Sequence, residues 1–338
     1  MKTAILALAA LAALGPAAGA ARADTLADVK AKGFVQCGVA PSTPGFALPD
    51  ADNSWSGMDV DYCRAMAAAI FNNADAVRYT PLSTEERFTA LSGKQVDVLS
   101  RTSTWTMGRD TSLGITFVGA TYYDGQGFMV RKADNITSAS QLSGSTICIE
   151  KDTTTELNAE DYFSSHDIDY KPLEFDTEDE TVKAFVDGRC NVFSSDASAL
   201  AGERSLFSNP DDYIILPEII SKEPLGPAVR QGDPVWFNIS RWTYFALLDA
   251  EELGVTSKNV DEMLGSDNAE IKRLLGVEDD FGSPIGLDKD WAYRIVKLVG
   301  NYAEIFNRDV GPDSPLKLPR GLNALWKDGG IQYAPPIR

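Results

Sequence analysis

Short apolar runs alternate with amphipathic segments in the stretch that follows Gly33. Residues 59–71 place apolar side chains at spacings of three and four, as expected for a helix with one buried face. The sequence Ser-Thr-Glu-Glu at 83–86 matches a capping box, which predicts a second helix that Gly93 closes. The strand-like runs are residues 34–39, 76–80 and 96–99. This order predicts a parallel sheet covered by helices on both faces.

A second unit of similar order follows the first. Residues 146–150 predict its opening strand, and Thr-Thr-Thr-Glu at 153–156 is a capping box for a helix that runs to about residue 165. Its later segments echo the first unit at residues 170–173, 179–187 and 188–194. Because several echoes occur in the same order, we expect two similar α/β lobes. The alignment lays Asp196 opposite Thr102, each just beyond the carboxyl end of a strand.

Two crossings between the lobes are expected. Residues 119–128 combine aromatic side chains with glycines, and residues 219–231 contain Pro224, Gly226 and Pro227, which should interrupt any regular element. Beyond them the pattern predicts helices over 236–253, 260–275 and 289–306, and an extended tail over 316–338 packed on the first lobe. The expected organisation is a first lobe at 24–121 plus 231–338 and a second lobe at 122–230.

Residues 1–23 have the pattern of a secretory signal peptide: Lys2, an apolar run at 5–14 and an Ala-Arg-Ala cleavage site at 21–23. No cysteine directly follows the run to accept a lipid, and no later stretch is long and apolar enough to span a membrane. We therefore expect an exported, periplasmic chain without a membrane anchor. Cleavage takes two basic residues from a chain of net charge −18, and the resulting −20 argues against nucleic acid as a partner.

The four cysteines fall into two pairs, one in each predicted lobe. In an oxidising compartment we expect the disulfides Cys37–Cys63 and Cys148–Cys190, although three connectivities are possible in principle. A metal site is the weaker interpretation, because the chain has no Cys-x-x-C motif and its one histidine, His166, lies in a polar stretch. No metal or cofactor is expected.

The segment 97–110 is the strongest candidate for a binding site. A predicted strand leads there into a loop rich in hydroxyl groups that holds Arg101 and Arg109. A guanidinium group can bind both oxygens of a carboxylate, and hydroxyl groups add neutral hydrogen bonds. From this segment alone, an ordinary Ser/Thr-rich surface loop is an alternative of about equal weight.

Several longer motifs resemble those of the periplasmic solute-binding proteins of polar amino-acid ABC importers. The motifs are GMDVDYCRA at 57–65, VDVLSRTSTWT at 96–106, TTTELN at 153–158, LPRGLNALW at 318–326 and YAPPIR at 333–338. They are most similar to the general L-amino-acid-binding family, associated with glutamate, glutamine, aspartate and asparagine uptake. The resemblance implies the type II two-lobe α/β fold with two parallel-type sheets, two hinge crossings and a helical C-terminal extension. It also implies two partners, an L-amino acid and the membrane permease of an ABC importer.

The resemblance also implies roles for particular residues. Arg109 matches the arginine that binds the α-carboxylate of the ligand, and Asp196 matches the aspartate that binds the α-ammonium. Hydroxyl or backbone groups of the site match Thr102, Thr104, Thr153 and Thr154. The turn at 153–154 suits an anion by itself, because a helix N-terminus has free N–H groups and a positive dipole end.

The chain departs from the family pattern at two places. Asp152 replaces a common glycine before the threonine turn, and the first loop lacks a tyrosine that stacks on the ligand in many relatives. Phe46, Trp55 or Trp105 is expected to take the place of that tyrosine, with core packing an equal alternative for Phe46 and Trp55.

The mechanism that we expect is reversible capture by hinge closure, without covalent chemistry. An enzyme on the same scaffold, a dehydratase or a lyase, is the alternative, and Glu150 is then the nominated acid or base beside Asp152 and Asp196. Arg101 has two interpretations of equal weight. It either selects acidic side chains of the ligand or pairs with an acid such as Asp152 and ties the closed lobes together.

Overall fold

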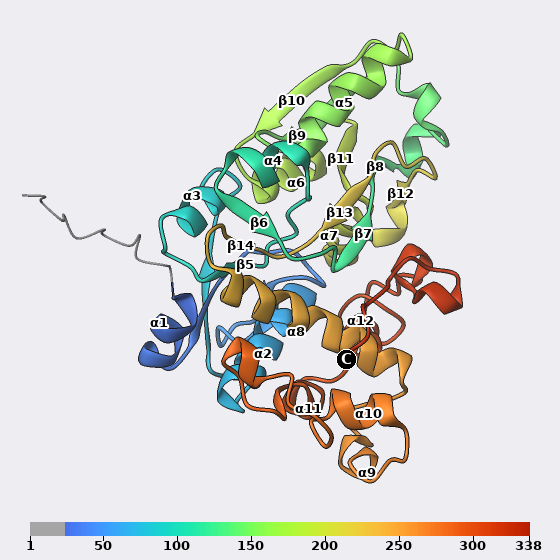
Figure 1. The fold of residues 1–338 in the computed structure, drawn as a ribbon. Helices are drawn as coiled ribbons and strands as arrows, with labels where there is room; N and C mark the ends of the chain where they lie inside the picture. The colour runs from blue at the N-terminus through green and yellow to red at the C-terminus, as the bar shows by residue number, and fades with distance from the viewer. Residues whose placement is uncertain (1–23) are drawn as a thin grey trace, which may run out of the picture.

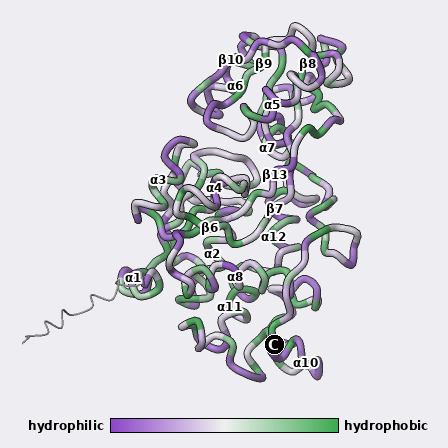
Figure 2. The backbone as a smooth tube through the Cα atoms, turned by 45° about the horizontal axis from the view of Figure 1, so that its top comes forward, coloured by the Kyte–Doolittle hydropathy of each residue, from purple (hydrophilic) through white to green (hydrophobic). Residues whose placement is uncertain are grey.

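The computed structural model describes residues 24–338, so the expected signal peptide at 1–23 lies outside the described residues. Two five-stranded sheets form two lobes, and helices cover each sheet (Figure 1). Hydrophobic segments mark the inner elements of each lobe, whereas hydrophilic segments predominate in the outer loops (Figure 2). The arrangement confirms the predicted two-lobe α/β fold.

The sheet of the first lobe has the order β4-β1-β5-β14-β6. Its strands are β1 (Val35–Val39), β4 (Val77–Pro81), β5 (Val98–Leu99), β6 (Ile115–Phe117) and β14 (Ala228–Arg230). Its helices are α1 (Thr25–Lys32), α2 (Met58–Phe71), α3 (Arg87–Ser92) and α4 (Met107–Ser112), and a small hairpin joins β2 (Leu48–Pro49) to β3 (Trp55–Ser56). The strands β4, β1 and β5 are parallel, as predicted, but β14 is antiparallel to both of its neighbours, so the sheet is mixed.

The sheet of the second lobe has the equivalent order β10-β9-β11-β8-β12. Its strands are β8 (Gln126–Arg131), β9 (Thr146–Glu150), β10 (Lys171–Phe175), β11 (Val192–Asp196) and β12 (Tyr213–Ile215). Its α-helices are α5 (Thr154–Ser165), α6 (Glu178–Val186) and α7 (Ala197–Leu206), with short 3₁₀ helices at Lys132–Asp134, Ala139–Gln141 and Pro210–Asp212. Here β8 is the antiparallel member between β11 and β12.

One disulfide lies within each lobe, in the predicted pairing. Cys37 on β1 is joined to Cys63 on α2 with 6.3 Å between the Cα atoms, and Cys148 on β9 is joined to Cys190 with 5.8 Å. Both separations lie in the usual range for a disulfide. Each bond fixes a helix or a loop against the strand next to the edge strand of its sheet, β1 in the first lobe and β9 in the second.

The two crossings pair with each other as a short antiparallel ribbon of β7 (Tyr122–Asp124) and β13 (Glu223–Leu225), which lies between the sheets (Figure 1). The expectation that the return crossing has no regular element was wrong. Pro224 lacks only the N–H group, and its carbonyl still accepts a hydrogen bond from the backbone of Trp105 at 2.8 Å. The lobe boundary expected at residue 230 also needs correction, because β14 already belongs to the first sheet.

Helices of the C-terminal region pack beneath the first sheet (Figure 1). They are α8 (Pro234–Glu252), α9 (Val260–Met263), α10 (Ala269–Leu274), α11 (Trp291–Leu298) and α12 (Tyr302–Asp309), with 3₁₀ turns at Ser283–Ile285, Gly321–Asn323 and Trp326–Asp328. The helices predicted at 260–275 and 289–306 are each broken in two. Asn268 caps the start of α10, and Gly300, at φ 107°, precedes a capping box of Asn301 and Glu304 that starts α12. Within the described residues, no helix is long and apolar enough to cross a bilayer.

The C-terminal tail packs against the first lobe and also against the hinge. The Asn323 side chain accepts a hydrogen bond from the Tyr123 amide at 2.7 Å and donates one to the Tyr123 carbonyl at 3.1 Å. Gln332 donates to the carbonyl of Ala120, where the first crossing begins. The tail therefore holds the first crossing at the point where it leaves the first lobe.

The lobes touch where Gly202 on α7 faces Pro44 in the first loop. A Cβ atom at Gly202 would lie 3.0 Å from the Pro44 carbonyl oxygen and 3.2 Å from its Cβ. A larger side chain at this position would therefore hold the lobes apart without disturbing the core of either lobe.

We predict that Gly202→Leu weakens every ligand of the cleft alike, because it disfavours the closed arrangement. A tenfold loss of the closed population lowers apparent affinity by about tenfold. Calorimetry should show this loss, and Gly202→Ala, with a smaller side chain, should show a smaller one. Native affinity in Gly202→Leu would contradict the closed contact.

Candidate functional site

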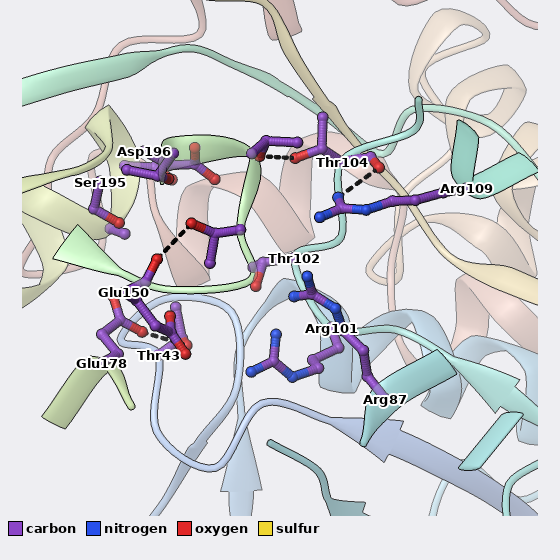
Figure 3. A pocket seen from close by; sticks show the side chains of 15 residues that line it. Thr43, Arg87, Arg101, Thr102, Thr104, Arg109, Glu150, Glu178, Ser195 and Asp196 are labelled. Carbon is purple, nitrogen blue, oxygen red and sulfur yellow. Dashed lines mark hydrogen bonds between the residues drawn. The ribbon is translucent and has the colours of Figure 1, made fainter. Parts of the chain in front are cut away.

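A polar cavity lies in the cleft, at the carboxyl ends of strands from both sheets (Figure 3). Its empty space, including the part open to solvent, is about 570 Å³. The first lobe lines it with Thr43, Arg87, Arg101, Thr102, Thr104 and Arg109. The second lobe adds Glu150, Thr153, Thr154, Thr155, Glu178, Ser195, Asp196, Ser198 and Ala199. Figure 3 shows the arginines on one side of the cavity and the acids on the other.

The structure thus brings together all seven polar residues that the sequence nominated as ligand-binding. It does not bring the three nominated aromatic residues there. Phe46 is 2% exposed and packs edge-on against Tyr122, and Trp55 packs against Tyr79. Trp105 stacks on Phe117 and lies outside the cavity lining. The expectation that one of them stacks on the ligand is therefore not supported by their positions.

The loop after β5 is held in place by Asp59, which lies in the first turn of α2. One carboxylate oxygen accepts a hydrogen bond from the Ser100 hydroxyl and the other from the Thr102 amide, each at 2.8 Å. Thr102 has a φ of 38°, so its backbone is in the left-handed region. Burial raises the pKa of Asp59 to about 6. This carboxylate therefore fixes the turn that presents Thr102 to the cavity.

Arg109 belongs to α4, which Thr106 caps by accepting a hydrogen bond from the Arg109 amide at 3.2 Å. One guanidinium nitrogen donates to the Thr104 carbonyl at 2.9 Å, and the group lies 5.3 Å from the ring centre of Phe88. Among the described residues, no carboxylate lies within 4.0 Å of this guanidinium. Its remaining donors are available to an anion in the cavity.

Arg101 is connected to the second lobe through Thr84. Its guanidinium donates to the Leu82 carbonyl at 2.8 Å and to the Thr84 hydroxyl at 2.9 Å. That hydroxyl in turn donates to Glu150 of the second lobe at 2.6 Å. The suggested pairing with Asp152 does not occur, because Asp152 is exposed outside the cavity lining.

Arg87, the first residue of α3, was missed by the sequence analysis. It is 4% exposed, and within residues 24–338 its guanidinium has neither a hydrogen-bond partner nor a carboxylate within 4.0 Å. Burial lowers the pKa of Arg87, and the charges of Arg101 and Arg109 lower it further. An unpaired buried arginine that faces a cavity is a candidate ligand contact. Its position directly after a capping box was the one sequence signal that pointed to a helix start.

Asp196 ends β11 and precedes α7. Its side chain forms no hydrogen bond with the part of the chain that the structure describes. Burial raises the pKa of Asp196 well above its ordinary value, as do the nearby charges of Asp124, Glu223 and Glu178, whereas Arg109 lowers it. The site therefore contains an acid that lacks a cation.

Glu178, at the start of α6, is a second acid of the cavity that forms no ion pair among the described residues. The sequence did not predict it as a site residue. Its contact with Thr43 of the first lobe is long, at 3.5 Å. Burial raises the pKa of Glu178 well above its ordinary value.

The N-terminus of α5 faces the cavity. Thr153 caps the helix by accepting a hydrogen bond from the Glu156 amide at 3.2 Å. The predicted capping box is incomplete, because Glu156 reaches the amide of Asp152 instead of that of Thr153. The free N–H groups of this first turn and its positive dipole end suit an anion.

Glu223 on the hinge strand β13 links the parts of the site and was also missed. It is 2% exposed, and it accepts hydrogen bonds from Thr104 at 2.6 Å and from Thr154 at 3.0 Å. Asn158 and Ser221 donate to its other oxygen at 2.7 and 2.6 Å. One carboxylate therefore joins the first lobe, the second lobe and the hinge.

The described residues contain no group of three His, Cys, Asp or Glu side chains placed to hold a metal ion. The cavity contains the Arg109 guanidinium, which has no carboxylate partner among the described residues, and the N-terminus of α5. The Asp196 carboxylate lies across the cavity from Arg109 (Figure 3). Charges of both signs in one small cavity suit a small zwitterion.

Residues 35–274 match the model of the bacterial extracellular solute-binding proteins, family 3. The chain belongs to this family. It is 57% identical to a general L-amino acid-binding periplasmic protein, AapJ, of Rhizobium johnstonii, over 96% of both chains. It is 49% identical to the glutamate/glutamine/aspartate/asparagine-binding protein BztA of Rhodobacter capsulatus, over all of this chain and 99% of that one.

Among solved structures, this solute-binding protein is similar to an ABC transporter periplasmic binding protein from Brucella ovis with glutathione bound. The TM-score is 0.92 at 56% identity, with 94% of this chain and 100% of that chain covered. The type II fold of the binding proteins is thereby shown for almost the whole described chain. Both AapJ and BztA are named as amino-acid-binding proteins, not as enzymes.

We predict that Asp196→Asn makes the empty solute-binding protein more stable at neutral pH. The pKa of Asp196 is raised in the folded state, so its contribution to folding is complete below the ordinary value of 3.8 and is lost as pH rises through the folded pKa. Melting temperatures of the ligand-free proteins should therefore differ more at pH 7 than at pH 4, with the variant higher. Asp211→Asn, at an exposed acid, is the charge-matched control and should show no such difference.

Proposed function

We propose that this protein captures an L-amino acid with a polar or acidic side chain in the cleft between its lobes. The observation that carries the proposal is that Arg109 and Asp196, neither of which forms an ion pair among the described residues, lie on opposite sides of one cavity. The α-carboxylate and the α-ammonium of an amino acid match these two groups in charge and number. The names of the relatives support the same class of ligand.

In the proposed complex, Arg109 and the first turn of α5 bind the α-carboxylate. Thr102, Thr104, Thr153 and Thr154 add hydroxyl or backbone groups that form hydrogen bonds without neutralising the ligand. Asp196 binds the α-ammonium. Glu223 keeps Thr104 and Thr154 in position, since it accepts a hydrogen bond from each hydroxyl.

We assign the side-chain end of the ligand to Arg87 rather than to Arg101. The Arg87 guanidinium lies 4.9 Å from the ring centre of Phe88 and forms no hydrogen bond or ion pair among the described residues. Arg101, in contrast, donates to Leu82 and Thr84 and through Thr84 reaches Glu150. Arg101 therefore fits the second interpretation, a tie between the closed lobes, although its partner is not Asp152.

Capture leads to transport through the shape of the closed protein. Both lobes complete the site, so the ligand stabilises the arrangement in which Thr84 bonds Glu150 across the cleft. The membrane permease of an ABC importer then distinguishes the closed form from the open one. Export to the periplasm, with cleavage after Ala23, completes the proposal, with lobes at 24–121 plus about 228–338 and at 122–227.

The enzyme alternative has no support from the relatives, which are named as binding proteins. Glu150, the acid nominated for such chemistry, already accepts the Thr84 hydroxyl at 2.6 Å. The glutathione in the Brucella ovis protein carries the same α-amino-acid head group, which fits a binding role.

The proposal predicts that Arg109→Ala and Asp196→Ala each weaken all amino-acid ligands alike, since all share the α groups. Removal of one partner of a desolvated charge pair costs about 2–5 kcal/mol, or roughly 30- to several-thousand-fold in affinity. A thermal-shift screen of the twenty L-amino acids finds the ligands, because 100 times the dissociation constant adds about 2.7 kcal/mol. Calorimetry then measures the variants. No stabilisation by any amino acid would refute the proposal.

A competition assay with glutamate and glutamine should distinguish the roles of the two remaining arginines, Arg87 and Arg101. Arg87→Ala is expected to change the ratio of the two affinities, because it removes a cation from the side-chain end only. Arg101→Ala is expected to weaken both ligands by a similar factor, because it loosens the contact between the lobes. A changed ratio in Arg101→Ala with an unchanged ratio in Arg87→Ala would reverse the assignment.

A further inference from the structure

A cavity outside the cleft lies in the C-terminal extension, where the end of the chain meets α8 and α10 (Figure 1). Its empty space, including the part open to solvent, is about 730 Å³. Its charged lining consists of three acids, Asp249, Glu252 and Glu270, and one basic residue, Arg338. No residue lines both this cavity and the one in the cleft, so the two are separate.

The acids of this cavity gather at the end of α8 that disfavours negative charge. The C-terminus of a helix carries a partial negative charge, so basic side chains are favoured there. The last turn of α8 instead contains Asp249, Glu251 and Glu252 and no basic residue. Arg320 pairs with Glu251 at 2.9 Å, but within residues 24–338 neither Asp249 nor Glu252 has a cation within 4.0 Å. The helix end that faces the cavity therefore lacks a positive charge.

Asp249 is the acid whose surroundings are least satisfied. One of its carboxylate oxygens is buried and has no hydrogen-bond partner in the part of the chain that the structure describes. Burial raises the pKa of Asp249 to about 7, together with the nearby charges of Glu252 and Glu270. Arg338 pairs with Glu270, at 3.4 Å, and not with Asp249. Because a buried acceptor without a donor is costly, a cation in the cavity would supply the missing partner.

Two aromatic rings stand at the rim of the same cavity. Trp326 is 52% exposed and Tyr333 is 63% exposed, and their ring centres lie 5.7 Å apart with the planes at 59°. The Trp326 indole donates a hydrogen bond to the Glu252 carboxylate at 3.2 Å, which holds the ring beside the acids. Aromatic faces attract cations, and rings grouped around a site are suited to alkylated ammonium groups. The rings therefore favour an organic cation over an inorganic one.

We infer that this cavity of the C-terminal extension binds a small organic ammonium ion. The charge of the ion lies near Asp249 and Glu252, at the negative end of α8. Its alkyl groups pack against Trp326 and Tyr333. The inference goes beyond the proposed function and does not depend on it, because no residue of the cleft takes part.

Choline and 3,3-dimethylbutan-1-ol are the probes, since the alcohol has the same shape with a carbon atom in place of the charged nitrogen. The readout is the indole N–H resonance of Trp326 in the ¹⁵N-labelled protein, assigned by its absence from Trp326→Phe. Choline chloride should shift this resonance saturably, whereas the alcohol, and sodium chloride at equal ionic strength, should bind at least about tenfold more weakly.

Two results would overturn the inference and leave the amino-acid site untouched. One is a Trp326 resonance that choline does not shift saturably below about 10 mM. The other is an equal response to choline and to the neutral alcohol, which would show that the cavity selects shape and not charge.

Variants measured by calorimetry separate the site from the negative charge of the whole surface. Asp249→Asn and Trp326→Leu should each weaken choline by about threefold to thirtyfold, and Trp326→Phe, which keeps an aromatic face, should weaken it less than Trp326→Leu. Glu262→Gln, at an exposed acid of α9 outside the cavity lining, is the charge-matched control and should keep the native affinity. Equal losses in Asp249→Asn and Glu262→Gln would contradict the site.

Discussion

Charged groups held away from water without partners are costly, and the cleft of this protein contains them on both sides. Arg87 is buried without a hydrogen bond or an ion pair among the described residues, and burial raises the pKa values of Asp196 and Glu178. A core made only for stability would pair such groups or replace them with apolar ones. A zwitterionic ligand supplies the missing charges, so its binding stabilises the arrangement that the empty protein holds at a cost.

The hinge region keeps the two sides of the cleft in register. Glu223 receives hydrogen bonds from Thr104 of the first lobe and from Thr154 and Asn158 of the second, while it sits on one of the two crossing strands. On the other strand, Tyr123 is bonded through its backbone to Asn323 of the C-terminal tail. The hinge is thus tied to the site on one side and to the C-terminal extension on the other.

Much of the fold could be predicted from the sequence, because its signals are local. The period of apolar residues located α2, a capping box located the start of α5, and the pairing of cysteines by lobe gave both disulfides. The long C-terminal helices were predicted as continuous because apolar spacing persists across the caps at Asn268 and Asn301. Caps of this kind interrupt a helix without interrupting its buried face.

The missed residues depend on contacts between distant parts of the chain. Arg87 matters only because α3 brings it to the cleft, and Glu223 only because three elements donate to it. Phe46 was nominated for the ligand, yet its ring is covered by Tyr122 of the hinge, a contact that no local pattern reveals. Resemblance nominated Arg109 and Asp196 for the α groups of the ligand, which are common to all amino acids, but it nominated no residue that the structure places at the side-chain end without a partner.

The central claim is that the ligand ammonium pairs with an aspartate whose pKa is raised in the empty cleft. Proton exchange on glutamine binding tests it most directly, by titration calorimetry in buffers of different ionisation enthalpy across the pH range in which the protein stays folded. The ammonium should lower the pKa of Asp196, so binding should release protons, with a maximum between the bound and free pKa values. Proton uptake, or no release at any pH in this range, would contradict the account.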